Sequence, residues 1–106
     1  MLLLPWYYWL QSKYKEPIKL SEAERVILEN IEKDYKWIAR DKSWENLYVY
    51  SSKPEKNEAK NWEPVEDAQD LLCFKHLFQF ITWQDDEPYN IEELLEENKW
   101  QIKNIW

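Results

Sequence analysis

The stretch that decides the fold is residues 35–50, YKWIARDKSWENLYVY. Its two ends, residues 35–40 and 47–50, are rich in aromatic and β-branched side chains, which favour strands. The connection between them is short and mainly polar. These features predict an antiparallel hairpin of two strands. Because the chain contains no glycine, we expect Asn46 or Asp41 to take the left-handed backbone position that such a turn needs.

A helix is predicted before this hairpin. Ser21 is a residue type favoured at helix N-termini, and Glu24 follows three positions later, which is the spacing of a capping box. The pattern that comes next predicts an amphipathic helix over residues 22–32. Its apolar positions recur at i, i+3, i+4 and i+8, as Ala23, Val26, Ile27 and Ile31.

The segment after the hairpin alternates between polar and apolar stretches. Residues 51–61 are polar and contain a proline, so we expect an exposed loop there. Trp62 is expected to begin a third strand or to lie across the sheet, and the acidic residues 65–70 to be irregular. The most apolar run of the chain is residues 71–83. Alternation in its second half predicts a buried strand, whereas its first half fits a helical turn.

A second helix is predicted near the end of the chain. Residues 85–89 have the composition of a loop, and Asn90 then stands at an N-cap position, with Glu93 three residues later. We expect this helix to end near Asn98. The final stretch, residues 100–106, alternates in a way that predicts an edge strand or a docking segment.

Together these elements predict an α+β fold with a small antiparallel sheet of three to four strands and two amphipathic helices. The 106 residues fit a single domain. We expect a core over residues 20–97, an aromatic N-terminal segment, residues 1–19, packed on it, and a tail over residues 98–106. The first ten residues are apolar but too few to span a bilayer, which takes about 20. Docking of their aromatic rings at a membrane interface is the alternative to packing.

The negative charge of the chain is concentrated in its second half. Residues 1–50 carry eight basic and eight acidic side chains, whereas residues 51–106 carry six basic and thirteen acidic ones, which gives the net charge of −7. A field of this sign repels nucleic acid and attracts basic surfaces. The densest cluster contains no Lys or Arg and consists of Asp85, Asp86, Glu87, Glu92, Glu93, Glu96 and Glu97.

The residues that usually carry chemistry are scarce. Cys73 is the single cysteine, so no intramolecular disulfide can form. It stands between Leu72 and Phe74, and we expect a buried, inert thiol. His76, the single histidine, is expected to be packed or hydrogen-bonded. Residues 85–87 offer oxygen ligands for Mg²⁺ or Ca²⁺, but their spacing matches no calcium loop. We therefore expect no catalytic residue, no metal site and no cofactor.

Several blocks of the chain follow one another in a recognisable order. They are Ser21–Leu28, Tyr35–Asp41, Leu47–Tyr50 with Lys53 and Pro54, His76–Ile81 and Asp86–Leu95. This ordered set, which covers roughly residues 20–97, resembles a group of small uncharacterised proteins encoded by phages and prophages of streptococci, lactococci and related Gram-positive bacteria. That group has glycine in the hairpin turn, where this chain has residues 43–46, SWEN. The resemblance implies a phage accessory protein that acts in a Gram-positive cytoplasm, and it carries over no catalytic residue.

These features favour a binding protein over an enzyme. Acidic side chains would steer association with a basic protein surface, and aromatic side chains would anchor it. By analogy with several anti-CRISPR proteins, the partner would be a host defence or nucleic-acid-handling protein. We expect no direct nucleic-acid binding and no membrane binding. The residues predicted to contact the partner are Asp85, Asp86, Glu87, Glu93, Glu96, Glu97, Trp44, Trp83 and Tyr89.

A small-molecule binder is the alternative function. Trp37, Trp62 and Trp83 could frame a pocket in which a nucleotide base stacks on aromatic rings. Arg40 would then contact its phosphate. This hypothesis predicts a deep aromatic pocket with a free guanidinium group.

Overall fold

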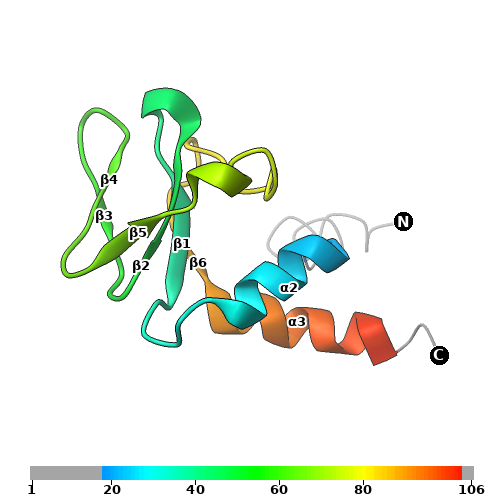
Figure 1. The fold of residues 1–106 in the computed structure, drawn as a ribbon. Coiled ribbons are helices and arrows are strands. Elements are labelled where there is room, and N and C mark those ends of the chain that lie inside the picture. Colours follow the sequence, from blue (N-terminus) through cyan, green and yellow to red (C-terminus); the bar gives the residue numbers. More distant parts are fainter. Residues whose placement is uncertain (1–17, 104–106) are drawn as a thin grey trace, which may run out of the picture.

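The computed structural model describes residues 18–103, so the expectations for residues 1–17 and 104–106 lie outside the described part of the chain. Two helices lie side by side on one side of an antiparallel sheet, and a small ribbon of two strands lies on the other side (Figure 1). The predicted α+β class is confirmed. The helices are α2 (Glu22–Asn30) and α3 (Ile91–Lys103).

The main sheet has four strands in the order β5-β2-β1-β6. Strands β1 (Trp37–Arg40) and β2 (Leu47–Tyr50) form the predicted antiparallel hairpin, with Trp37 opposite Tyr50. Strand β5 (Ala68–Asp70) extends the sheet beyond β2, and β6 (Tyr89–Asn90) extends it beyond β1. Because β6 runs directly into α3, it places the start of that helix at the sheet edge.

Each face of the hairpin carries its own apolar cluster, as alternation along a strand requires. The face toward the outer ribbon holds Ala39, Tyr50 and Trp62, with Trp37 and Tyr48 packed against them. The ribbon itself consists of β3 (Glu55–Lys56) and β4 (Trp62–Glu63). The larger cluster lies on the helix side and contains Leu20, Leu28, Ile38, Leu47, Val49, Leu71, Phe78, Ile81, Ile91 and Leu94.

Helix α2 begins with the predicted capping box. The Ser21 hydroxyl accepts from the Glu24 N–H at 3.1 Å, and the Glu24 carboxylate accepts from the Ser21 N–H at 2.9 Å. The helix ends at Asn30, one residue before Ile31 adopts extended backbone angles. The helix is therefore two residues shorter than predicted.

The hairpin turn differs from the prediction. Trp44 and Glu45, in a short 3₁₀ turn η1 (Ser43–Glu45), take positive φ values of 58° and 53°. Asn46 is extended, and Asp41 is not among the residues with positive φ. The physical reason is that Asp41 and Asn46 flank the turn and hydrogen-bond to each other. The Asp41 N–H donates to the Asn46 carbonyl at 2.9 Å, so the left-handed positions fall to residues between them.

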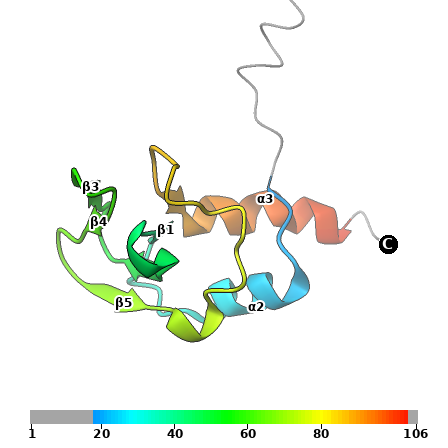
Figure 2. The same ribbon diagram turned by 90° about the horizontal axis from the view of Figure 1, so that it is seen from above.

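The apolar run 71–83 does not form the predicted buried strand. It contains a 3₁₀ helix η2 (Leu72–Phe74), which fits the predicted helical turn, followed by a series of turns. Phe78 has a φ of 57°. In Figure 2 the segment that follows η2 runs from the α2 side of the molecule to the start of α3. Phe78 and Ile81 are still buried, at 0% and 2% exposed, so the apolar signal was correct and the conformation was wrong.

A single buried cation explains why this run needs no strand partner. The Arg40 side chain is 6% exposed, and its guanidinium group donates to five backbone carbonyls. These bonds satisfy carbonyl groups that a neighbouring strand would otherwise have to satisfy. The acceptors, with their distances, are Ile81 at 2.7 Å, Glu45 and Leu77 at 2.9 Å, and Lys75 and Phe78 at 3.0 Å.

Three further predictions are corrected. The supposed loop 51–61 contains β3, and the supposedly irregular residues 65–70 contain β5. Trp62 does begin a strand, but this strand belongs to the outer ribbon. Helix α3 continues past Asn98 to Lys103, so residues 100–103 are helical rather than an edge strand.

The reason α3 does not end at Asn98 is that its amide is fully engaged. The side chain is 3% exposed and donates to the carbonyls of Leu94 (2.8 Å) and Ile18 (2.9 Å). Its oxygen accepts from the Leu20 N–H at 2.8 Å. Asn98 therefore joins the chain before α2 to the middle of α3, which is a long-range role rather than a capping one.

Candidate functional site

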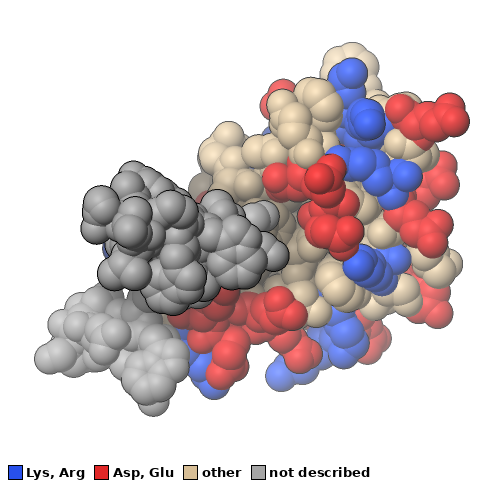
Figure 3. Space-filling view, turned by 180° about the vertical axis from the view of Figure 1, so that it is seen from behind, with Lys and Arg blue, Asp and Glu red and all other residues tan. Residues whose placement is uncertain are grey.

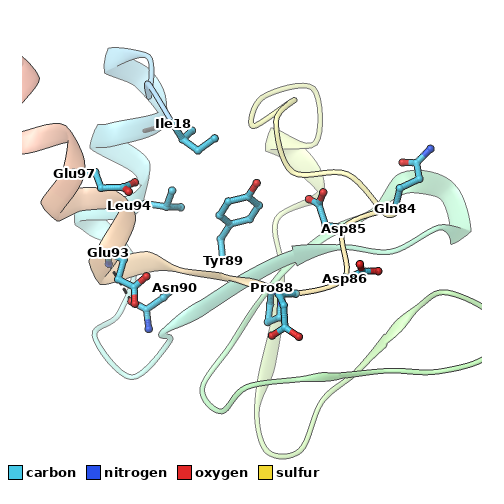
Figure 4. Close-up of a pocket in the computed structure, with 11 residues that line it drawn as sticks. Ile18, Gln84, Asp85, Asp86, Pro88, Tyr89, Asn90, Glu93, Leu94 and Glu97 are labelled. Atoms are coloured by element: carbon cyan, nitrogen blue, oxygen red, sulfur yellow. Dashed lines mark hydrogen bonds between the residues drawn. The ribbon is translucent and has the colours of Figure 1, made fainter. Parts of the chain in front are cut away.

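The main candidate site is a hollow of about 430 Å³ between α3 and the loop that precedes β6. Figure 4 shows its lining side chains, which come from that loop, from β6, from the first turns of α3 and from the residue where the described chain begins. We call it the acidic groove, and it is lined by Ile18, Gln84, Asp85, Asp86, Glu87, Pro88, Tyr89, Asn90, Glu93, Leu94 and Glu97.

Local hydrogen bonds position the loop side of the acidic groove. The Asp85 carboxylate accepts from the Thr82 N–H at 2.9 Å and from the Thr82 hydroxyl at 3.1 Å. The Lys56 ammonium group donates to the carbonyls of Trp83, at 2.7 Å, and Asp85. Asp85 therefore has a structural role as well as a charge that faces the groove.

The helix side is positioned by the start of α3. The Asn90 side-chain oxygen accepts from the Glu93 N–H at 3.0 Å, which confirms Asn90 as the predicted cap. The Ile91 N–H donates to the Lys36 carbonyl at 2.9 Å, so the first turn is attached to β1's lead-in residue. This arrangement presents Glu93 and Glu97, one helical turn apart, toward the same hollow.

Tyr89 stands in the middle of the acidic groove. Its ring is half-buried and packs edge-on against Phe80, with centroids 5.3 Å apart and an interplanar angle of 87°. In Figure 4 its hydroxyl group rises between Ile18 and Asp85. Burial raises the pKa of the Tyr89 phenol, and the negative charges of Asp85 and Glu97 raise it further. Tyr89 is thus a neutral donor surrounded by carboxylates.

The remaining carboxylates of the groove are open to solvent. Asp86, Glu87, Glu93 and Glu97 are exposed. Glu87 pairs with Lys53 at 2.8 Å, but both side chains are more than half exposed, and such surface pairs contribute little free energy. Figure 3 shows acidic side chains near the middle of the rear face, and both acidic and basic side chains toward the β3–β4 end. Among the described residues, 18–103, Glu87 is the one groove carboxylate that forms an ion pair with a Lys or Arg side chain.

The structure brings together six of the nine residues predicted to contact a partner, and three lie elsewhere. Glu96 is exposed beside Lys99, with a 3.6 Å ion pair. Trp44 is 82% exposed on the hairpin turn. Trp83 is half-buried, and the Lys42 ammonium group lies 5.0 Å from its ring centroid. The six that line the acidic groove are Asp85, Asp86, Glu87, Tyr89, Glu93 and Glu97.

Sequence reasoning missed the apolar part of the groove. Pro88 and Leu94 are buried beside the carboxylates, and Ile18 approaches from far along the chain. Leu94 belongs to the predicted apolar stripe of α3, so its proximity to Glu93 and Glu97 could have been found from the helical period. Nothing local in the sequence indicates that Ile18 lies there.

The aromatic nucleotide pocket proposed as the alternative does not form. Every side-chain nitrogen of Arg40 is engaged with backbone carbonyls, so no donor is left for a phosphate. Burial lowers the pKa of this guanidinium group, and the nearby Glu45 opposes that shift. Trp62 is 6% exposed and packs with Ala39 and Tyr50, so its ring offers no stacking face.

The two residues expected to be buried or packed in the apolar run are on the surface. Cys73 is exposed, and so is His76, whose backbone carbonyl accepts from the Gln79 side chain at 2.7 Å. The cause is that η2, which contains Cys73, and the turns after it bury Phe78 and Ile81 instead of these two side chains. Within residues 18–103 no three His, Cys, Asp or Glu side chains are grouped so that they could hold a metal ion.

In the described residues no helix has both the length and the apolar character needed to cross a membrane. No protein-family model matches the chain, and neither a curated protein nor a solved structure does.

Proposed function

We propose that this chain is a non-enzymatic binding protein whose acidic groove receives a basic surface of a protein partner. The observation that carries the proposal is the arrangement of five carboxylates around Tyr89 in one hollow. A cluster of like charges without matching cations is unfavourable in the free protein and becomes favourable when a basic surface approaches.

The groove offers two kinds of contact to a basic partner. Its exposed carboxylates attract and orient Lys and Arg head groups, which increases the association rate. The buried Pro88 and Leu94, with the half-buried Tyr89 ring, give an apolar wall. The aliphatic stems of Lys and Arg side chains pack well on such a wall, and a ring face adds a cation–π contact.

The partner has to cover more than this hollow. A stable interface buries about 800 Å² on each partner, and a hollow of 430 Å³ holds only one or two long side chains. Trp44, on the hairpin turn at 82% exposed, is a second contact that fits the aromatic anchors of protein interfaces. Within this wider interface, the acidic groove would select a partner that presents Lys or Arg side chains.

The finer identity of the partner follows from charge and from the resemblance to phage proteins. A basic surface that is complementary to clustered carboxylates is what a nucleic-acid groove offers, since it holds phosphates. We therefore propose a phage accessory protein that acts in the host cytoplasm and blocks a host defence or nucleic-acid-handling protein. The support for this step is the acidic groove and the resemblance, and it is an analogy with anti-CRISPR proteins.

The test uses two charge-reversal variants with the same change in net charge. The groove variant carries Asp86→Lys, Glu93→Lys and Glu97→Lys. The control variant carries Glu32→Lys, Glu55→Lys and Glu58→Lys, three exposed residues outside the acidic groove. Tagged protein captures partners from a Gram-positive host lysate at low salt, and mass spectrometry quantifies them.

The expected result is a protein with a basic surface captured by the wild type and by the control variant but not by the groove variant. Association rates measured with that purified protein should fall at least tenfold for the groove variant and should fall with salt for the wild type. Equal capture by all three chains would contradict the proposal, because the groove carboxylates would then contribute nothing to binding. An equal loss of capture in both variants would also contradict it, because net charge and not the groove would then be responsible.

A further inference from the structure

A second hollow lies on the opposite part of the helical layer and is apolar. It has a volume of about 700 Å³ and lies between α2 and the segment around η2. We call it the apolar groove. Five of its lining side chains are aliphatic or aromatic, and the other three carry one carboxylate, the thiol and the imidazole. The lining residues are Glu22, Ala23, Val26, Ile27, Cys73, Phe74, His76 and Leu77.

This groove leaves apolar surface of the described residues uncovered. Within α2 only Leu28 is buried, and Val26 is 44% exposed. Leu72, at the start of η2, is 46% exposed. A contiguous apolar hollow bordered by polar groups marks a surface that another segment or molecule covers.

The chain itself supplies a segment with matching chemistry. Residues 1–10, MLLLPWYYWL, contain no charged side chain and nine apolar or aromatic residues besides Pro5. The acidic groove is a poor place for such a segment, because apolar rings would desolvate its carboxylates. The apolar groove has only Glu22 and His76 as titratable side chains besides Cys73, and both residues are exposed to solvent.

The path between the segment and the groove is short. Ile18 and Leu20 are attached to α3 through the Asn98 amide, and α2 begins two residues after Leu20, with Glu22 already at the groove. The seven connecting residues, 11–17, reach about 24 Å when extended. Nine helical residues, the length of α2, span only about 13 Å. The connection is therefore long enough to bring the segment to the end of the groove at Glu22, from which its ten residues can extend along α2.

We propose that residues 1–10 lie in the apolar groove between α2 and η2 and cover Cys73. A tethered segment has a high effective concentration at a nearby site, so it occupies the groove ahead of any free partner. This inference does not depend on the function of the acidic groove, which is lined by different residues.

The single cysteine provides the measurement. Cys73 lines the apolar groove and no other thiol is present in the chain, so a thiol reagent such as a disulfide dye reports on this position alone. The rate with native full-length protein is compared with the rate after unfolding in urea. The segment variant carries Leu3→Ser, Leu4→Ser and Trp6→Ser. The matched control carries three changes in the connecting residues: Gln11→Ser, Lys13→Ser and Lys15→Ser.

Docking of the segment predicts slow labelling of the wild type and of the control, and labelling at least tenfold faster for the segment variant. The variant Val26→Asn, in the lining of the apolar groove, should also label faster, because a polar side chain there weakens the docking of an apolar segment. Val26 is an exposed position of α2, so this change should leave the fold intact. It provides the test independently should the segment variant fail to fold, which circular dichroism and urea unfolding would reveal.

Two outcomes would overturn the proposal. In the first, Cys73 of the wild type reacts as fast as in the segment variant, which would mean that residues 1–10 do not cover it. In the second, protection of Cys73 rises with protein concentration and accompanies a dimer in sedimentation, which would assign the cover to a second copy of the chain. Protection that is independent of concentration supports the tethered segment.

Discussion

Two charged regions of this molecule behave in opposite ways. Arg40 is a single buried cation whose donors are all directed at backbone carbonyls of the 71–83 run and of the hairpin turn. The acidic groove gathers five carboxylates, most of them exposed, and in the described part of the chain only Glu87 among them forms an ion pair with a Lys or Arg side chain. The difference teaches that the buried charge determines the fold, whereas the surface charge is available for a partner. Changes at Arg40 should therefore affect stability, and changes in the acidic groove should affect binding.

The largest effect is expected at Arg40. Arg40→Met keeps a long side chain but removes every hydrogen bond to the five carbonyls. Hydrogen bonds to a charged group contribute about 1.5–3 kcal/mol each, but they do not add within one network. We expect the free energy of unfolding to fall by about 3–5 kcal/mol, the typical cost of removing one side of a buried charged interaction. Urea unfolding measures this change.

Arg40→Lys is the matched control for that variant. It keeps the positive charge but not the planar fork of five donors, so it should restore only part of the lost free energy of unfolding. A loss below about 1 kcal/mol in Arg40→Met would contradict the role given to this side chain, because it would fall in the range of an ordinary surface hydrogen bond.

A smaller loss is expected at Asn98, the uncharged counterpart of Arg40. Asn98→Leu keeps the volume but leaves the Leu20 N–H and the Ile18 carbonyl without their partner. The free energy of unfolding should fall by about 1–3 kcal/mol, measured in urea. The control Lys99→Leu alters a neighbouring exposed residue and should change the free energy by less than about 0.5 kcal/mol.

The acidic groove should show almost no effect on stability. Glu93→Gln with Glu97→Gln should leave the free energy of unfolding within about 0.5 kcal/mol of the wild type, because both side chains are exposed. The same pair should slow association with a basic partner, and stopped-flow kinetics at low and high salt would measure this. A loss of stability as large as that of Asn98→Leu would contradict the conclusion that the groove carboxylates serve binding and not the fold.

The smallest effect concerns the pH response of Tyr89. Burial and then the charges of Asp85 and Glu97 raise its pKa, so the folded state keeps the phenol proton longer than the unfolded chain does. The stabilisation is present below about pH 10, the ordinary pKa of tyrosine, and is lost as the pH rises from there through the folded pKa.

Glu97→Gln removes one of these charges and should therefore lower the pH at which Tyr89 ionises. Ultraviolet absorbance of tyrosinate, with Tyr89→Phe as the reference that isolates this residue, measures the shift. Glu96→Gln is the control, since Glu96 does not line the acidic groove. An identical shift in the two glutamine variants would mean that net charge, and not the proximity of Glu97, sets the pKa.

The sequence allowed prediction of those elements whose signals are local. The capping box at Ser21, the hairpin strands and the Asn90 cap all depend on residues within a few positions of one another, and all three are confirmed. The acidic groove was partly predictable for the same reason. Its carboxylates come from one loop and from one face of the next helix, so their sequence neighbourhood already brings them together.

The features that could not be predicted depend on partners far along the chain. The 71–83 run has the alternation of a strand, but Arg40, more than thirty residues earlier, satisfies its carbonyls and makes turns possible. The hairpin turn placed Trp44 in a left-handed conformation although Asn46 was available. Ile18 reaches the groove only because Asn98 holds the preceding segment. No local pattern contains such information.

The contacts of Asn98 also have a kinetic consequence. They join residues separated by 78 and 80 positions, so they close a loop that includes nearly the whole described chain. Contacts of such separation form late, after the loop-closure entropy has been lost to more local structure. We therefore expect these contacts to break early in unfolding, so that the Leu20 amide exchanges its hydrogen with solvent in a partial opening, before the amides of the hairpin strands do.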